Sequence, residues 1–328
     1  MTEREQIQRR SNEKPSGGLL LGIIIGSLAT LFISDIAESS RPRLVPAETQ
    51  ADAPQTPSAQ CPKQEYPRMQ PTEVKTALEY SELYEYTSQL DGADSFEEAQ
   101  AIMNQVFGKW NYTVKIGSVP VLDERLIETH GDSVEHTPEL ITQQLVNISS
   151  IHILEALVNI PASLLEATRG TDLYLTMGMV GEDGGYAGLY SKDTKGRPNI
   201  IVGIGPDDPS GEIFEHELAH NLFFRLCGDE IGYNDTELAS LNPEDFYYTR
   251  KELPSSHWEG ITSSRYGATN TAEDTAEMFE DILTVRLGER CFMNESFQDP
   301  DSPLCKKMDL LLQRIAAVEP ETAAYLGA

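Results

Sequence analysis

The chain has 328 residues, which is enough for one large domain or two small ones with a sizeable hydrophobic core. Its 39% of hydrophobic and 24% of charged residues are ordinary for a globular protein, but its net charge of -28 is not. Because so many carboxylates would repel phosphate groups, the composition argues against nucleic acid as a partner.

An uncharged run near the amino terminus, residues 15–34, predicts a single transmembrane helix. At about 1.5 Å per residue, a helix of this length spans about 30 Å, the thickness of the hydrocarbon layer. Basic residues before the run outnumber those that closely follow it: Arg4, Arg9, Arg10 and Lys14 against Arg41 and Arg43. The positive-inside rule therefore places residues 1–14 in the cytoplasm and the rest of the chain in the periplasm or outside the cell. A signal peptide cleaved near Ala29 is the alternative, and it would export the same domain.

The predicted membrane helix carries a glycine at every fourth position, at Gly18, Gly22 and Gly26. Small residues at this spacing let two membrane helices approach closely, which makes a homodimer through this face one expectation. Residues 35–71 are rich in proline and predict an extended linker. The linker would hold a folded domain, residues 72–328, away from the membrane.

Patterns of apolar residues and the positions of Gly and Pro predict the elements of this domain. They are, in chain order, helices at 72–90 and 95–108, a strand at 110–116, a helical stretch at 137–168 divided by Pro161, strands at 171–180 and 199–205, and helices at 208–228 and 272–286. This order predicts a mixed α/β fold with a helical first part, residues 72–137, and a core, residues 138–288. In the core a small sheet would support the helix at 208–228.

That helix contains the motif His-Glu-x-x-His. His216 and His220 lie one turn apart on one helix face, where they can bind a single metal ion with Glu217 beside it. A catalytic zinc site needs a third protein ligand and a water. The metzincin spacing does not supply it, because Phe223 and Leu226 stand where that motif requires Gly and His.

The third ligand is expected on the helix at 272–286. Only His257 follows His220 in the chain, so a carboxylate is favoured over a third histidine. The acidic residues Glu273, Glu277 and Glu280 share one face of the helix by their spacing. Spacing alone leaves two registers open: Glu273 binds the metal with Glu277 behind it, or Glu277 binds it with Asp281 behind it. If no metal binds, these acidic residues would form a solvent-exposed face of the helix.

The stretch YGATNTAEDTAEMF, residues 266–279, resembles the metal-binding half of the anthrax lethal factor-like metallopeptidases. That family also includes secreted proline–proline endopeptidases. In its pattern a Tyr, a short polar run and a helix with the Glu ligand follow the HExxH motif. The resemblance spans about residues 138–288 and implies a zincin-like α+β fold. It also implies that Glu273 is the third zinc ligand, that Tyr266 faces the reaction centre and that Glu277 supports the ligands.

One Zn²⁺ held by His216, His220 and Glu273 would lower the pKa of its water from about 15.7 to near 7. Glu217 would take the proton of this water and pass it to the leaving amine. Tyr266 would donate a hydrogen bond to the developing oxyanion. The expected function is a membrane-anchored, extracytoplasmic zinc endopeptidase that hydrolyses peptide bonds in peptides or proteins.

Two other functions stay open from the sequence. An exported, non-catalytic binding module could retain a zincin-like fold, although it would have no need of Glu217. A structural or adhesion protein could carry HExxH by chance. Cys291 and Cys305 are the nearest pair in the sequence among the four cysteines, which makes a disulfide between them one expectation. Three glycines carry another expectation. Gly184, Gly185 and Gly188 would let a substrate strand approach, or they form a hairpin turn.

Overall fold

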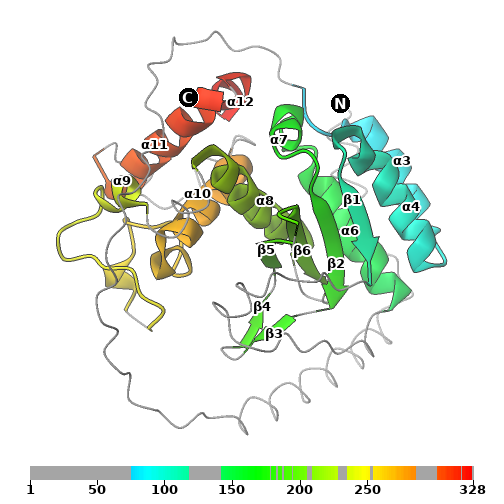
Figure 1. Ribbon diagram of the computed structural model, residues 1–328, viewed down its shortest axis with the longest axis horizontal. Coiled ribbons are helices and arrows are strands. Elements are labelled where there is room, and N and C mark those ends of the chain that lie inside the picture. Colours follow the sequence, from blue (N-terminus) through cyan, green and yellow to red (C-terminus); the bar gives the residue numbers. More distant parts are fainter. Residues whose placement is uncertain are drawn as a thin grey trace, which may run out of the picture. The chain divides into compact units, whose positions relative to one another are not determined.

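Figure 1 shows the computed structural model of the chain. The structure describes residues 75–117, 142–177, 179–181, 184–186, 188–193, 195–204, 209–227, 235–251, 254–285, 301–318 and 320–326. The predicted membrane helix at 15–34, with its three glycines, and the linker at 35–71 lie outside the described residues, as does Cys291. Among the described residues, no helix is both long enough and apolar enough to cross a bilayer.

The centre of the domain is a four-stranded sheet with the strand order β1-β2-β6-β5. Strands β1 (Thr113–Ile116), β2 (Asp172–Met177) and β6 (Pro198–Ile204) are parallel, and β5 (Gly188–Lys192) pairs antiparallel with β6 at one edge. Leu173, Tyr174 and Leu175 of β2 are all buried although they alternate between the two faces, which is typical of parallel strands covered on both sides. A separate antiparallel pair consists of β3 (Met179–Gly181) and β4 (Gly184–Tyr186).

Two helices precede the sheet, α3 (Tyr80–Asp91) and α4 (Phe96–Phe107). The predicted start of the first helix at residue 72 was wrong, because the helix begins at Tyr80. The backbone N–H groups of Ala77 and Leu78 donate to Ile160 O and Leu157 O, so this segment is held against residues 157–160 instead of forming a helix. A short 3₁₀ turn, η1 (Gly108–Trp110), leads from α4 into β1.

The predicted division at Pro161 is confirmed. Helix α6 (Gln143–Ala156) ends before it, and α7 (Ala162–Ala167) begins directly after it with Pro161 as its N-cap residue. Proline suits this boundary because it has no N–H to donate and its φ is already set for a helix start. At the other end of α6, the hydroxyl of Thr142 accepts a hydrogen bond from the backbone N–H of Leu145.

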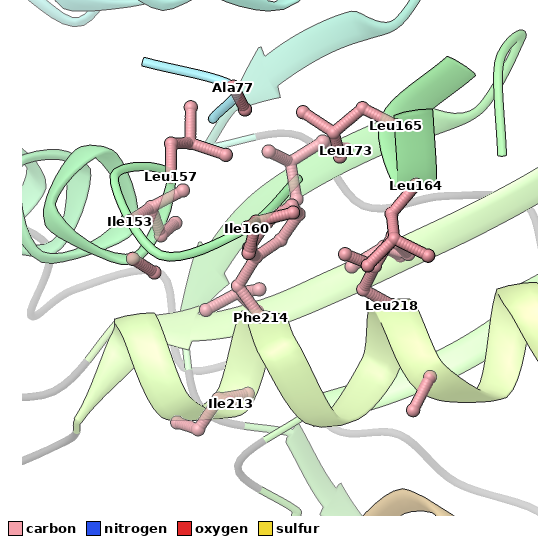
Figure 2. Close-up of a cluster of buried hydrophobic side chains, with 14 of the residues drawn as sticks. Ala77, Ile153, Leu157, Ile160, Leu164, Leu165, Leu173, Ile213, Phe214 and Leu218 are labelled. Carbon is pink, nitrogen blue, oxygen red and sulfur yellow. The ribbon is translucent and has the colours of Figure 1, made fainter. Parts of the chain in front are cut away.

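Helix α8 (Ser210–Cys227), which carries the HExxH motif, contacts α6 and strands β5 and β6. Figure 2 shows its apolar residues Phe214 and Leu218 directed toward Ile160 and Leu164 in the buried core. Residues two positions further along a helix point to the opposite side. The packing of Phe214 and Leu218 therefore turns His216 and His220 away from this core.

Helix α10 (Thr271–Val285), preceded by the 3₁₀ turn η4 (Gly267–Thr269), packs on α8 on the side away from the parallel strands (Figure 1). The other helices that the structure describes are α9 (Thr236–Ala239), η3 (Ser255–His257), α11 (Pro303–Val318) and α12 (Pro320–Leu326). Helix α11 contacts α10, and α12 contacts α7. The predicted mixed α/β class is confirmed, with a small sheet and α8 laid against it.

Candidate metal centre

The side chains of His216, His220 and Glu273 converge between α8 and α10. Oε2 of Glu273 lies 3.0 Å from Nε2 of His216 and 3.2 Å from Nε2 of His220, and the two Nε2 atoms are 3.2 Å apart. Ligand atoms that surround a zinc ion at about 2.0–2.1 Å in a tetrahedron lie roughly 3.3 Å from one another. The three atoms therefore have the spacing of zinc ligands.

The charges around His216 favour a cation at this point. Its Nδ1 lies 3.1 Å from Oε1 of Glu277 and 3.8 Å from Oε2 of Glu280. With a metal bound, a carboxylate at Nδ1 would hold the ring proton there, so that Nε2, which faces Glu273, would offer its lone pair to the ion. Burial opposes a charge on His216, yet Glu273, Glu277 and Glu280 raise its pKa well above the ordinary value.

The local structure of α10 explains how Glu273 reaches the histidines. Oδ1 of Asn270 accepts hydrogen bonds from the backbone N–H groups of Ala272 and Glu273, at 2.9 and 3.0 Å, and so caps the helix. Glu273 thus occupies the first turn, next to α8. Burial acts to raise the pKa of Glu273, but His220 and His216 outweigh it and hold the pKa well below its usual range.

The structure places the other expected ligands and supports in distinct positions. Glu277 lies behind His216, as the first register requires. Asp281 belongs to neither of the two His/Glu groups found among the described residues, which are His216, His220 and Glu273, and His216, Glu277 and Glu280. His257 lines the same cleft, but its ring stacks on Phe246 and its Nε2 lies 3.0 Å from Tyr247 O. His257 is thus not brought to the group.

Glu217 is 5% exposed and lies against strand β5. The backbone N–H of Tyr190 donates to its carboxylate, and burial raises its pKa. Its other oxygen, Oε2, is buried and has no hydrogen-bond partner in the part of the chain that the structure describes. A buried carboxylate oxygen without a donor is costly. Its position beside the two histidines fits a group that receives a proton from a reactant.

Gly188 makes room for Glu217. A Cβ atom at this position would lie 2.5 Å from Oε1 of Glu217 and 2.6 Å from Cγ2 of Ile213, which is closer than real contacts allow. The sequence suggested that Gly188 serves the approach of a substrate strand. The structure adds a different reason for the glycine, since any side chain there displaces the carboxylate.

We therefore expect Gly188→Ala to lower kcat/KM about 10²-fold, because a catalytic group moved by about 1 Å loses its alignment. Zinc content should stay unchanged, since the three atoms that lie nearest to a Cβ there belong to Glu217 and Ile213 and not to the metal group. Gly108→Ala is the matched control, because a Cβ there meets nothing within 4 Å. The measurement is peptide cleavage together with elemental analysis. Unchanged cleavage by the Gly188 variant would contradict the proposed alignment of Glu217.

Tyr266 is 50% exposed, and its ring centroid lies 5.8 Å from that of His216. Partial burial and the carboxylates of Glu273 and Glu217 raise the pKa of its hydroxyl. The hydroxyl therefore keeps its proton and can donate a hydrogen bond beside the metal group. The structure thus brings the ring of Tyr266 beside His216, and its role toward a reaction centre stays a prediction.

The group opens into a cleft of about 980 Å³. Glu212, Glu277 and Glu280 line it from α8 and α10, whereas Arg250, Lys251 and Arg265 come from the segment before α10. Sequence reasoning missed these basic residues and Trp258, which also lines the cleft. Their only signal was that they precede Tyr266 within a short stretch of the chain.

Comparisons of the chain with models of protein families, with curated proteins and with solved structures found no match. The resemblance to lethal factor-like metallopeptidases, about residues 138–288, therefore stays a prediction. The described residues include His and Glu side chains within metal-binding distance of one another. The function has to be inferred from this arrangement.

Proposed function

We propose that the protein is a zinc endopeptidase with a zincin-like fold, anchored in the membrane by residues 15–34. The observation that carries the proposal is the convergence of His216 Nε2, His220 Nε2 and Glu273 Oε2 within 3.2 Å of one another. Two imidazoles and one carboxylate are the ligand set of many hydrolytic zinc sites, which keep a fourth position open. The buried carboxylate of Glu217 beside this set supports a hydrolytic site over a purely structural one.

Zinc at this site would supply Lewis acidity, which lowers the pKa of a water and polarises the peptide carbonyl. Glu217 would remove one proton from the attacking water through Oε2, the oxygen without a partner. As the C–N bond breaks, the same carboxylate would transfer that proton to the amine. The products would be a carboxylic acid and an amine, and transfer of the remaining acid proton to the amine would give a carboxylate and an ammonium group.

Tyr266 and Glu277 would have different parts in this reaction. The phenol of Tyr266 would donate to the carbonyl oxygen as that oxygen becomes negative. Glu277 would hold the Nδ1 proton of His216 and so orient the ring, because its Oε1 lies 3.1 Å from Nδ1. Strand β5 borders the cleft at the edge of the sheet, where the backbone of an extended peptide could pair with it.

We expect Tyr266→Phe to lower kcat by about 10²–10³-fold with little change in KM, because only a transition-state hydrogen bond is removed. Tyr247→Phe is the matched control, since Tyr247 is also exposed but packs on His257 instead of His216. Steady-state kinetics on one cleaved peptide measures both constants. An unchanged kcat for Tyr266→Phe would show that the phenol does not stabilise the oxyanion.

The competing function is a non-catalytic binding module, because a cleft of this size could bind a ligand without cutting it. The two functions separate when the full-length chain in a mild detergent is incubated with a pool of peptides. Mass spectrometry should detect new termini that disappear with a chelator and return with added Zn²⁺. Zinc-loaded protein that cuts no peptide would leave the binding module as the function.

The orientation in the membrane is tested separately. Protease added to spheroplasts should digest the proposed catalytic domain and spare a cytoplasmic control protein. Complete protection of the domain would reverse the proposed topology. An amino-terminal sequence that starts after residue 29 would replace the anchor by a cleaved signal peptide.

A further inference from the structure

Helix α11 directs two buried cations toward the start of α10. Lys307 and Arg314 are seven residues apart, so they lie on the same helix face. The side chain of Lys307 is 0% exposed and that of Arg314 is 7% exposed. Lysine and arginine are seldom buried unless each has partners that satisfy its charge. The partners of both residues lead to the first turn of α10, which carries Glu273.

Lys307 contacts the residue next to Glu273. Its Nζ lies 2.7 Å from Oδ2 of Asp274, which also accepts a 2.6 Å hydrogen bond from the hydroxyl of Tyr248. The same Nζ donates to Ile261 O at 2.8 Å. It also lies 5.5 Å from the ring centroid of Phe246, within the range of a cation–π contact. Lys307 thus joins α10 to the segment that borders the cleft.

Asp274 also packs against the segment that presents Tyr266. A Cβ atom at Gly267 would lie 3.3 Å from Cα of Asp274, so the backbones of η4 and α10 are in close contact there. Asp274 therefore pairs with Lys307, directly follows the proposed ligand Glu273 and packs against Gly267, the neighbour of the proposed oxyanion donor Tyr266. A shift of Asp274 would move both functional side chains.

Arg314 holds the same turn by a second route. Its guanidinium forms a bidentate salt bridge with the carboxylate of Asp235, in which Nη1 donates to Oδ2 and Nη2 lies 3.1 Å from Oδ1. The backbone N–H of Asp235 donates to the hydroxyl of Thr271 at 3.1 Å. Thr271 is the first residue of α10. Arg314 therefore fixes the helix start, two residues before Glu273.

We propose that Lys307 and Arg314 are positioning residues for the metal centre, and that α11 belongs to the active-site framework. This inference rests on the proposed function, because it takes Glu273 to be a metal ligand. Buried ion pairs cost much desolvation and add little net stability, so apolar side chains would serve simple packing as well. Unlike apolar packing, directed hydrogen bonds fix the angle and the register of one helix relative to its neighbour. A metal ligand needs that precision, to within about 0.5 Å.

The test compares zinc affinity among variants of the full-length chain in detergent, by competition with a chromogenic chelator. Lys307→Met combined with Asp274→Asn removes both charges, so neither is left buried without a partner. Lys306→Met is the matched control, because Lys306 is an exposed neighbour on the same helix. We expect the double variant to melt cooperatively and to bind Zn²⁺ about tenfold more weakly, the low end of the effect of supporting residues. The control should stay within twofold of the wild type.

A spectroscopic readout separates positioning from general stability. Co²⁺ in place of Zn²⁺ reports ligand geometry through its visible absorption bands. These bands should shift in the double variant and stay unchanged in Lys306→Met. A lower melting temperature with unchanged zinc affinity and unchanged bands would overturn the inference, since Lys307 would then only stabilise the fold.

Arg314→Lys decides the question if the Lys307 variant does not fold. The lysine keeps the positive charge but cannot form the bidentate salt bridge with Asp235. We expect this variant to fold and to bind zinc about tenfold more weakly, whereas wild-type affinity would overturn the inference. Wild-type protein that binds no zinc would overturn the proposed function, and the inference with it. Tight wild-type binding with unaffected variants would overturn the inference alone.

Discussion

Glu217→Gln should abolish nearly all peptide cleavage and leave zinc in place. The amide has the shape of the carboxylate and can still accept the N–H of Tyr190, but it cannot take a proton from water. Loss of a general base lowers kcat by about 10²–10⁴-fold. The buried Oε2 of Glu217 has no hydrogen-bond partner among the described residues, so it can accept this proton without breaking another hydrogen bond that the structure describes. The measurement is kcat on one cleaved peptide, with zinc content determined by elemental analysis.

Glu155→Gln is the matched control for this substitution, because Glu155 is exposed on α6 and does not line the cleft. It should keep wild-type activity and wild-type zinc. Activity of Glu217→Gln within a few-fold of the wild type would mean that another group is the base. Loss of zinc from the same variant would assign Glu217 to the metal instead of the reaction.

Glu273→Ala should remove most of the bound zinc. Two imidazoles would remain, which is one protein ligand fewer than catalytic zinc sites have. Residues that only support a ligand contribute about 10–100-fold to metal affinity, so Glu277→Ala should show an effect of that size. Glu273→Ala should exceed it. Zinc affinity measured on both variants tests the register that spacing alone could not decide.

His257→Ala is the control for this pair of variants. The structure stacks His257 on Phe246 and leaves it outside the His216, His220 and Glu273 group, so its removal should not change zinc affinity. Near-full zinc occupancy in Glu273→Ala would refute the ligand assignment. It would bring Glu277 or His257 forward as the third ligand.

Local patterns in the sequence were enough to predict most elements of the core. Helix α8 and helix α10 both lie within two residues of their predicted bounds, because each is long and has apolar residues at helical spacing. The pairing of His216 with His220 followed from helix geometry alone. The start of α3 was misplaced, because Ala77 and Leu78 bond to a loop that is distant in the sequence.

The parts that the sequence could not predict depend on long-range contacts. Glu273, Glu277 and Glu280 share a helix face, so only the packing of α10 on α8 decides which of them meets His220. Lys307 and Arg314 look like ordinary charged residues of a surface helix. Their burial depends on Asp274 and Asp235, which lie 33 and 79 residues away in the chain.

The most direct measurement of the metal centre is zinc X-ray absorption on the full-length chain loaded with one equivalent of Zn²⁺. We expect a single shell of nitrogen and oxygen ligands at about 2.0–2.2 Å. Scattering from two imidazole rings should accompany it. A sulfur shell near about 2.3 Å, a number of imidazoles other than two, or a failure to bind one equivalent of zinc would contradict a centre built from His216, His220 and Glu273.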